Sequence, residues 1–189
     1  MLGQLEVDEG ERVRIEAPKQ RAVLEVLAIF ADADVAPATL IDAVWGDAPP
    51  PTAAKSLHSH VSRLRSVLPD GAIVTDGQAY RLDLDPDDVD AHRFERFVMT
   101  AGQAIDGDEP ARALELADAA IDLWRGRPLE DLAEGVVLEG HGARLDELLT
   151  TARELRLAAL IGLGRHEQAV VDAEELTASH PLRESGWAH

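Results

Sequence analysis

The stretch Thr52–Leu68, TAAKSLHSHVSRLRSVL, predicts the helix on which the rest of the fold is organised. Its apolar residues Leu57, Val61, Leu64 and Leu68 recur at helical spacing and form one stripe that can dock on a core. The opposite face is hydroxyl-rich and mildly basic, and the stretch contains no acidic residue. Such a face can enter a DNA major groove, because small hydroxyls allow close approach while Lys and Arg reach bases and phosphates. The alternative is an ordinary surface helix with a serine-rich face.

The segments around this helix predict its setting. Ile73–Thr75 and Tyr80–Leu82 are β-prone runs separated by Asp76–Ala79, which predicts a hairpin. Two shorter helices precede the long one, the first opened by Pro18 and the second spanning Pro37–Trp45, and Thr52 suits an N-cap. Helix, helix, long helix and hairpin is the order of a winged helix-turn-helix, in which the long helix reads DNA and the hairpin is the wing.

The first residues and the second half complete the predicted architecture. Leu2–Val7 and Arg12–Ile15 alternate apolar and polar residues and predict an antiparallel pair of strands. Acidic, turn-prone residues 83–90 predict a domain boundary, giving an α+β winged helix-turn-helix domain over residues 1–85 and an all-α domain over 86–189, mainly α overall. Predicted helices in the second domain are Ala91–Ile105, Pro110–Trp124, Ala143–Leu163 and His166–Ser179, with a loop at Arg125–Gly142. We expect Trp45 and Trp124 in separate cores.

Small residues in the second half have the spacing of a helical repeat. Gly164, Ala169 and Pro181 stand where tetratricopeptide units place a turn glycine, a close-packing alanine and a closing proline. A weaker copy is formed by Gly107, Ala113, Ala117 and Ala120. The pattern favours a tetratricopeptide-like (TPR-like) domain, although a plain helical bundle also fits it.

Charge and composition bound the function. The chain of 189 residues has a net charge of −18, and most of the excess lies in the second half: residues 1–84 hold 8 Lys/Arg and 13 Asp/Glu, residues 85–189 hold 10 and 23. A DNA-binding face must therefore be a local patch on an acidic body. With no cysteine there is no disulfide or thiolate metal site, and no secretory signal or membrane-spanning run is visible, which favours the cytoplasm.

Ordered motifs along the whole chain resemble the Streptomyces antibiotic regulatory protein (SARP) family. They are Leu2–Val7, Pro18–Arg21, Leu40–Gly46, His60–Arg65, Asp90–Glu95, Leu123–Gly126 and Leu163–His166. Members join an OmpR-type winged helix to a bacterial transcriptional activator domain. The resemblance implies a sequence-specific activator that binds promoter direct repeats in double-stranded DNA and helps to recruit RNA polymerase.

On this reading the helix Thr52–Leu68 supplies most of the DNA contacts. The expected contacts from it are Lys55 and Arg63 directly, Ser56, Ser59 and Ser62 through hydrogen bonds, and Arg65 nearer the core side. Arg81 on the wing could reach a phosphate, as could Lys19 and Arg21 near the start of the first helix. Asp76 and Ala79 depart from the basic residue and the glycine common in family wings, and an acid at the wing tip would repel phosphate.

The sequence gives no sign of enzyme chemistry. No nucleophile, phosphate-loop or metalloprotease motif occurs, and no cofactor or metal ligand set is present. His58 and His60, two apart on a helix, point away from each other and cannot share a metal. The rival hypothesis is a helical protein-interaction scaffold whose winged helix binds DNA weakly or not at all.

The resemblance also implies a truncated second domain, because the family normally continues into further helices beyond Pro181–Trp187. We expect Leu182–His189 to be frayed and to leave an apolar patch that promotes self-association.

Overall fold

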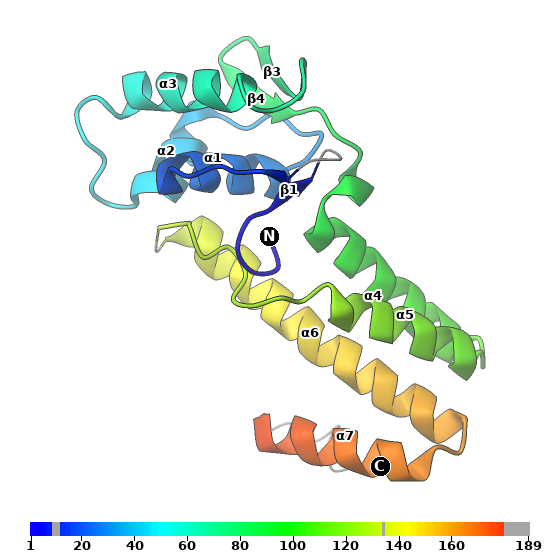
Figure 1. Ribbon diagram of the computed structural model, residues 1–189. Coiled ribbons are helices and arrows are strands. Elements are labelled where there is room, and N and C mark those ends of the chain that lie inside the picture. Colours follow the sequence, from blue (N-terminus) through cyan, green and yellow to red (C-terminus); the bar gives the residue numbers. More distant parts are fainter. Residues whose placement is uncertain (9–11, 134, 180–189) are drawn as a thin grey trace. The chain divides into compact units, whose positions relative to one another are not determined.

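The computed structural model describes residues 1–8, 12–133 and 135–179 (Figure 1). Two compact units divide the chain: unit 1 contains Met1–His92 and Arg125–Ala143, and unit 2 contains Arg93–Trp124 and the chain from Arg144 onward. Each is built as a separate body with its own core. In the described ranges, no helix has both the length and the apolar content needed to cross a membrane.

Unit 1 begins with a strand pair shorter than predicted. β1 (Val7–Asp8) pairs antiparallel with β2 (Arg12–Val13), with Val7 opposite Val13. The prediction of a strand from Leu2 onward is wrong, because the backbone of Leu2 is bonded elsewhere. Its N–H donates to the Asp90 carboxylate (3.2 Å) and its carbonyl accepts from the Arg125 N–H (2.7 Å). These bonds take the place of a strand ladder.

The winged-helix order is confirmed in the rest of unit 1. It runs through α1 (Pro18–Ile29), α2 (Pro37–Trp45), α3 (Ala53–Arg65), β3 (Ile73–Asp76) and β4 (Ala79–Leu82). Proline stands at the start of α1 and α2, where its missing N–H costs nothing. α2 and α3 each bury one apolar face, whereas α1 is buried on all sides from Ala22 to Ala28. The core side chains include Val23, Leu27, Leu40, Val44, Leu57, Val61 and Leu64. The hairpin turn is tighter than predicted: Asp76 pairs with Ala79, so only Gly77 and Gln78 lie between the strands. Gly77 has a φ of 57°, which glycine adopts without strain.

The remaining elements are helical. A 3₁₀ turn at Pro86–Asp88 precedes α4 (Asp90–Asp106), α5 (Pro110–Asp122), α6 (Val136–Gly162) and α7 (His166–Ser179). The four long helices were predicted, but α6 begins at Val136 rather than near Ala143. The predicted loop Arg125–Gly142 includes Gly140 and Gly142, yet each glycine costs only about 1 kcal/mol inside a helix, which packing can offset.

Unit 2 owes its close helix packing to small residues, as predicted. Ala113, Ala117 and Ala120 on α5 are fully buried, and Ala169 on α7 joins the same core as Leu157 and Leu160 of α6. Gly164, with a φ of 70°, makes the turn between α6 and α7. Pro181 and the predicted apolar patch at Leu182–His189 lie outside the described residues.

The two tryptophans lie in separate units, as expected. Trp124 packs against Phe94 in unit 2, with ring centroids 5.5 Å apart. Trp45 lies in unit 1 at the end of α2. Both side chains are half-buried, so each forms the rim of a core.

Candidate nucleic-acid interface

The outer face of α3 carries the sequence-predicted site residues on a solvent-exposed surface. Lys55, Ser59, Ser62 and Arg63 are exposed and Ser56 is half-exposed. In the part of the chain that the structure describes, Lys55 and Arg63 form no ion pair. Their positive charges are therefore available to a ligand. Leu57, Val61 and Leu64 hold the opposite side of the helix in the core.

The hydroxyl groups on this face are partly committed to the helix itself. Ser59 Oγ donates to the Lys55 carbonyl (3.1 Å) and Ser66 Oγ donates to the Arg63 carbonyl (2.7 Å). A hydroxyl that donates its proton to the backbone still has its oxygen free to accept. Ser59 therefore suits an amino group on a base edge better than it suits a phosphate oxygen.

The start of α3 differs from the prediction. Thr52 occupies the N-cap position, but its side chain makes no capping bond and its φ and ψ are −98° and 12°. An N-cap hydroxyl normally reaches the helix from extended backbone. Here the Ala53 N–H instead donates to the Pro50 carbonyl (2.9 Å), so a backbone turn after the proline run leads into the helix. Thr52 is thus at the predicted N-cap position, but without the side-chain bond that usually makes a threonine favourable there.

One edge of α3 is joined to the wing, and α3 lies along the β3–β4 hairpin in Figure 1. Arg65 Nε donates to the Ile73 carbonyl (2.9 Å) and its Nη2 donates to Thr75 Oγ1 (2.7 Å). The hydroxyl of Tyr80 and His58 Nδ1 are 2.7 Å apart. On β4, Arg81 forms an ion pair with Asp34 at 3.4 Å. The structure thus brings Arg65 and Arg81 to the wing, with a protein partner for each, and leaves Asp76 exposed near its tip.

The other edge of α3 faces the junction of α1 and α2. Lys19 Nζ donates to the Val44 carbonyl and lies 5.6 Å from the centroid of the Trp45 ring. His60 packs on the same tryptophan at 6.0 Å. Burial, followed by the charges of Arg63 and Lys19, lowers the pKa of His60. His60 is therefore neutral at pH 7, and the positive charge of this edge comes from Lys19 and Arg63.

Arg21 is used inside unit 1. Its Nε and Nη2 donate to the two carboxylate oxygens of Asp131, both at 2.7 Å, and its Nη1 donates to the carbonyls of Ile15 and Glu16. The hydrogen bonds that it donates to Asp131 raise the pKa of Arg21. Nothing in the sequence pointed to this partner, which lies 110 residues further along the chain. A bidentate pair with two extra carbonyl contacts is a structural anchor.

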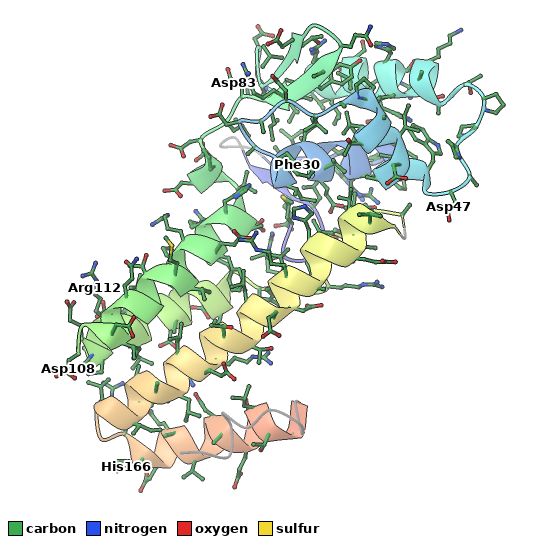
Figure 2. The ribbon with its side chains drawn as sticks, turned by 180° about the vertical axis from the view of Figure 1, so that it is seen from behind. Phe30, Asp47, Asp83, Asp108, Arg112 and His166 are labelled. Carbon is green, nitrogen blue, oxygen red and sulfur yellow. The ribbon has the colours of Figure 1, made fainter. Side chains whose placement is uncertain are left out.

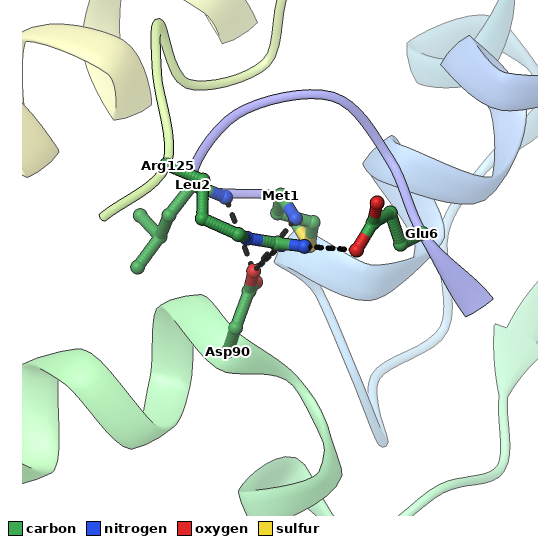
Figure 3. Close-up of polar contacts among 5 residues, drawn as sticks. All are labelled: Met1, Leu2, Glu6, Asp90 and Arg125. Carbon is green, nitrogen blue, oxygen red and sulfur yellow. Dashed lines mark hydrogen bonds and ion pairs between the residues drawn. The ribbon is translucent and has the colours of Figure 1, made fainter. Parts of the chain in front are cut away.

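Residues 125–133, here called the strap, belong to unit 1 through several such contacts. Arg125 donates to Glu6 and to Asp90, both at 2.6 Å, and Asp90 also accepts from the Met1 amino group at 2.9 Å (Figure 3). Burial alone would raise the pKa of Asp90, but these cations and the Leu2 N–H outweigh it and lower that pKa.

Further along the strap, Leu129 is fully buried and the Ala133 N–H donates to the Ala43 carbonyl of α2 (3.0 Å). The strap therefore supports α1 and α2, the helices beneath α3.

The described residues offer no metal site, because no group of three or more His, Asp or Glu side chains gathers among them. His58 and His60 engage Tyr80 and Trp45 respectively, so they point to opposite edges of α3, as predicted.

Comparisons with known proteins agree with this geometry. The family model described as Transcriptional regulatory protein, C terminal, matches residues 10–82, and the Bacterial transcriptional activator domain matches residues 89–189. Transcriptional regulator RedD of Streptomyces coelicolor is 36% identical over 90% of this chain and 51% of its own length. Regulatory protein DnrI of Streptomyces peucetius is 33% identical over 100% of this chain and 74% of its own length.

A solved structure shows the same fold. Mycobacterium tuberculosis EmbR, in complex with a low affinity phosphopeptide, is 33% identical and superposes with a TM-score of 0.91 over 98% of this chain and 51% of that one. The chain thus spans about half the length of RedD and of the EmbR chain. These relatives are named as regulators, not as enzymes. With both family models matched in order, the chain belongs to the SARP family of transcriptional regulators, with an OmpR-type winged helix followed by a TPR-like bacterial transcriptional activator domain.

Proposed function

We propose that this protein is a cytoplasmic, sequence-specific DNA-binding activator of transcription that reads promoter direct repeats with the outer face of α3. We assign DNA binding to residues 1–85 and activation to residues 86–189. The family models support this division, since they match residues 10–82 and 89–189. Residues 86–92 and Arg125–Ala143, which include the strap, are the exceptions, because they lie in the second region by sequence and in unit 1 by structure.

The observation that carries the proposal is the state of the charges on α3. The helix has no acidic residue, and its two outward cations, Lys55 and Arg63, have no ion-pair partner within the described ranges of the chain. In a protein with a net charge of −18, cations left without carboxylates on a groove-sized helix suit an external anion. The short hydroxyl side chains of Ser56, Ser59 and Ser62, which lie between these two cations in the sequence, allow the helix to approach base edges closely.

The partners of the basic residues predict that the protein contacts few DNA phosphates. Arg21 is bound to Asp131, Arg65 to the wing and Arg81 to Asp34, which leaves Lys55, Arg63 and Lys19 as the principal candidates. With about 0.9 counterion released per phosphate, three to five contacts give a slope of log affinity against log salt of about −3 to −5. Asp76 on the wing tip keeps this number low by repelling phosphate.

The test is selection of DNA from a random-sequence library by the full chain, followed by mobility shifts of the selected DNA over a salt series. We expect an enriched sequence, bound at least about a hundredfold more tightly than unrelated DNA, and a slope in the range above. Binding without sequence preference would contradict the proposal.

Contact with RNA polymerase and self-association are proposed for unit 2. α7 exposes Val170 and Val171, each more than half accessible, on a helix that otherwise buries Ala169 and Leu176. Addition of RNA polymerase to the DNA complex should give a further mobility shift that a variant with Val170 and Val171 both changed to Ser lacks. Sedimentation of the same two proteins checks self-association.

The second candidate function, a helical interaction scaffold, rests on an open groove in unit 2. Its polar walls come from α5, α6 and α7 and include Asp118, Asp122, Arg153, Arg156 and Asp172. Arg156 is held between Asp118 (2.6 Å) and Asp172, so much of the groove's charge is internally paired. A chain that shows no DNA preference but retains a protein partner would favour this function.

A further inference from the structure

Two separate contacts join α3 to the wing, and both leave the same edge of the helix. His58 and Arg65 are seven residues apart, which is two helical turns, so their side chains project in nearly the same direction. His58 meets Tyr80 on β4, and Arg65 meets Ile73 and Thr75 on β3. The helix therefore holds each strand of the hairpin at a different point along its axis.

A hairpin of this size needs such support. β3 and β4 are four residues each, and an isolated two-stranded hairpin is at best marginally stable in water. The core already holds the base of the hairpin, through the buried side chains of Ile73 and Leu82 and a hydrogen bond from the Asp32 N–H to the Leu82 carbonyl. Two contacts, one to each strand and two turns apart, fix both the position of the wing and its tilt relative to the helix.

Tyr80 ties the brace to the scaffold. Its side chain is only 3% exposed, and its backbone exchanges two hydrogen bonds with Val35, at 2.8 and 3.0 Å. The Tyr80 hydroxyl is thus a fixed point inside unit 1 to which His58 is bound. A residue buried to this extent cannot touch DNA, so any influence that it has on DNA recognition must pass through position.

We propose that His58, Arg65 and Tyr80 form a two-point brace that sets the angle between the wing and the outer face of α3, and that Arg65 is a positioning residue in DNA recognition. The proposal rests on the proposed function. From the sequence, Arg65 is one of the expected DNA contacts, nearer the core side of the helix. The proposal gives it a different role, because two of its guanidinium nitrogens are directed at the wing.

The brace can be tested first on the protein alone. Tyr80→Phe removes only the hydroxyl, and Arg65→Met keeps the aliphatic stem while removing the guanidinium. We expect faster amide hydrogen exchange in β3 and β4 for each variant, with α1 and α2 unchanged. Combining Tyr80→Phe with His58→Ala should give little more than either alone, since both remove the same bond. Wild-type exchange in Tyr80→Phe and in Arg65→Met would overturn the brace.

The second arm uses DNA selected by the wild-type chain. For both brace variants we expect the preference for selected over unrelated DNA to fall about 2- to 10-fold, the size of one or two hydrogen bonds. Affinity for unrelated DNA and its salt slope should not change. Lys55→Met is the matched control: the loss of an outward cation from the same helix should weaken binding to all DNA and make the slope shallower by about one.

The outcomes separate the brace from the proposed function. A slope on unrelated DNA made shallower by about one in Arg65→Met would show that Arg65 contacts phosphate and would overturn its positioning role. If the wild-type chain shows no sequence preference, the proposed function fails and with it the role of the brace in DNA recognition. The amide hydrogen-exchange experiment, which contains no DNA, then still decides whether the brace exists.

Discussion

α1 and α3, the two helices of unit 1 that carry the predicted cations, use their charges in opposite ways. On α1, Arg21 donates two hydrogen bonds, from Nε and Nη2, to Asp131 of the strap, and Glu25 one turn later is fully buried. On the outer face of α3, Lys55 and Arg63 point to solvent without a carboxylate. Arg21 and Arg63 are the same residue type and both lie on helices of the predicted DNA-binding domain, yet they have different roles. A cation that is bound inside the protein stabilises the fold, whereas a cation without a partner is available to a ligand.

The largest expected effect is a pH dependence of the free energy of unfolding, caused by Glu25 on α1. Burial, with the charge of Asp131 and, more weakly, of Glu130, raises the pKa of Glu25 from 4.5 to about 8, and the Met1 amino group opposes this. In the described chain neither carboxyl oxygen accepts a hydrogen bond of ordinary geometry, although the nearby Asp131 backbone N–H also opposes the rise in pKa. Arg21, one turn earlier on α1, is committed to Asp131.

Between pH 4.5 and about pH 8, Glu25 loses its proton in the unfolded chain but keeps it in the folded chain. Stability is therefore highest at low pH within this window and falls as pH rises, by up to about 1.4 kcal/mol per pH unit. Denaturant unfolding of wild type and Glu25→Gln from pH 5 to pH 8 should show a difference that grows across the range in favour of the variant. Glu25→Leu, which also lacks the carboxyl, should behave in the same way. Parallel pH profiles for all three proteins would contradict the prediction.

The second effect breaks the anchor of α1 to the strap. Asp131→Ala leaves Arg21 mostly buried without its carboxylate, and we expect the free energy of unfolding to fall by about 3 kcal/mol. The control is Arg112→Ala. Arg112 points into solvent from unit 2 (Figure 2) and pairs with Glu109 only 3.3 Å away on the surface. Its loss should cost no more than about 0.5 kcal/mol. Equal losses for the two variants would show that the strap contact adds nothing.

The contrast also explains which features the sequence could predict. Helices α1 to α3, the wing and the small-residue packing of unit 2 follow from local periodicity, turn residues and spacing, and those predictions are confirmed. The strap could not be predicted in this way. Its role depends on pairing Arg21 with Asp131 and Leu2 with Arg125 across most of the chain, and no local pattern encodes such distant partners.

The same limit applies to the candidate site. Sequence spacing placed Lys55, Ser59 and Ser62 on one face of the helix with Arg63 on its flank, and the structure shows all four exposed. Sequence spacing could not show which positively charged side chains are already bound to other residues of the protein. Arg21 and Arg65 have the same residue type as Arg63 and also lie on helices, but their partners come from the strap and from the wing.

The third prediction tests the α3 side of the comparison. Arg63→Ala should weaken binding to selected DNA by about 1–3 kcal/mol and relax the preference at one base position, if Arg63 reads a guanine. Lys55→Ala should weaken binding to all sequences more evenly, as expected for a phosphate contact. Competition mobility shifts against single-base variants of the selected DNA would measure both. Arg144→Ala, which removes a surface arginine from unit 2, serves as a control. Unchanged affinity in both α3 variants would show that α3 is not the reading helix.

The smallest effect concerns the entry into α3. Replacing a capping Thr by Ala normally costs about 1 kcal/mol, because the hydroxyl satisfies a free N–H at the helix start. Thr52 makes no such bond, and the turn from Pro50 to Ala53 supplies the backbone contact instead. Thr52→Ala should therefore change the free energy of unfolding by less than about 0.3 kcal/mol. Asp85→Ala is the matched comparison, since the Asp85 carboxylate accepts from the Asp87 N–H at 3.0 Å and caps the following 3₁₀ turn. Thermal unfolding of the two variants should thus rank Asp85→Ala as the more damaging. The reverse order would mean that the Thr52 side chain turns inward and caps α3 in solution. Thr52 would then belong with the bound residues of unit 1 rather than with the open face of α3.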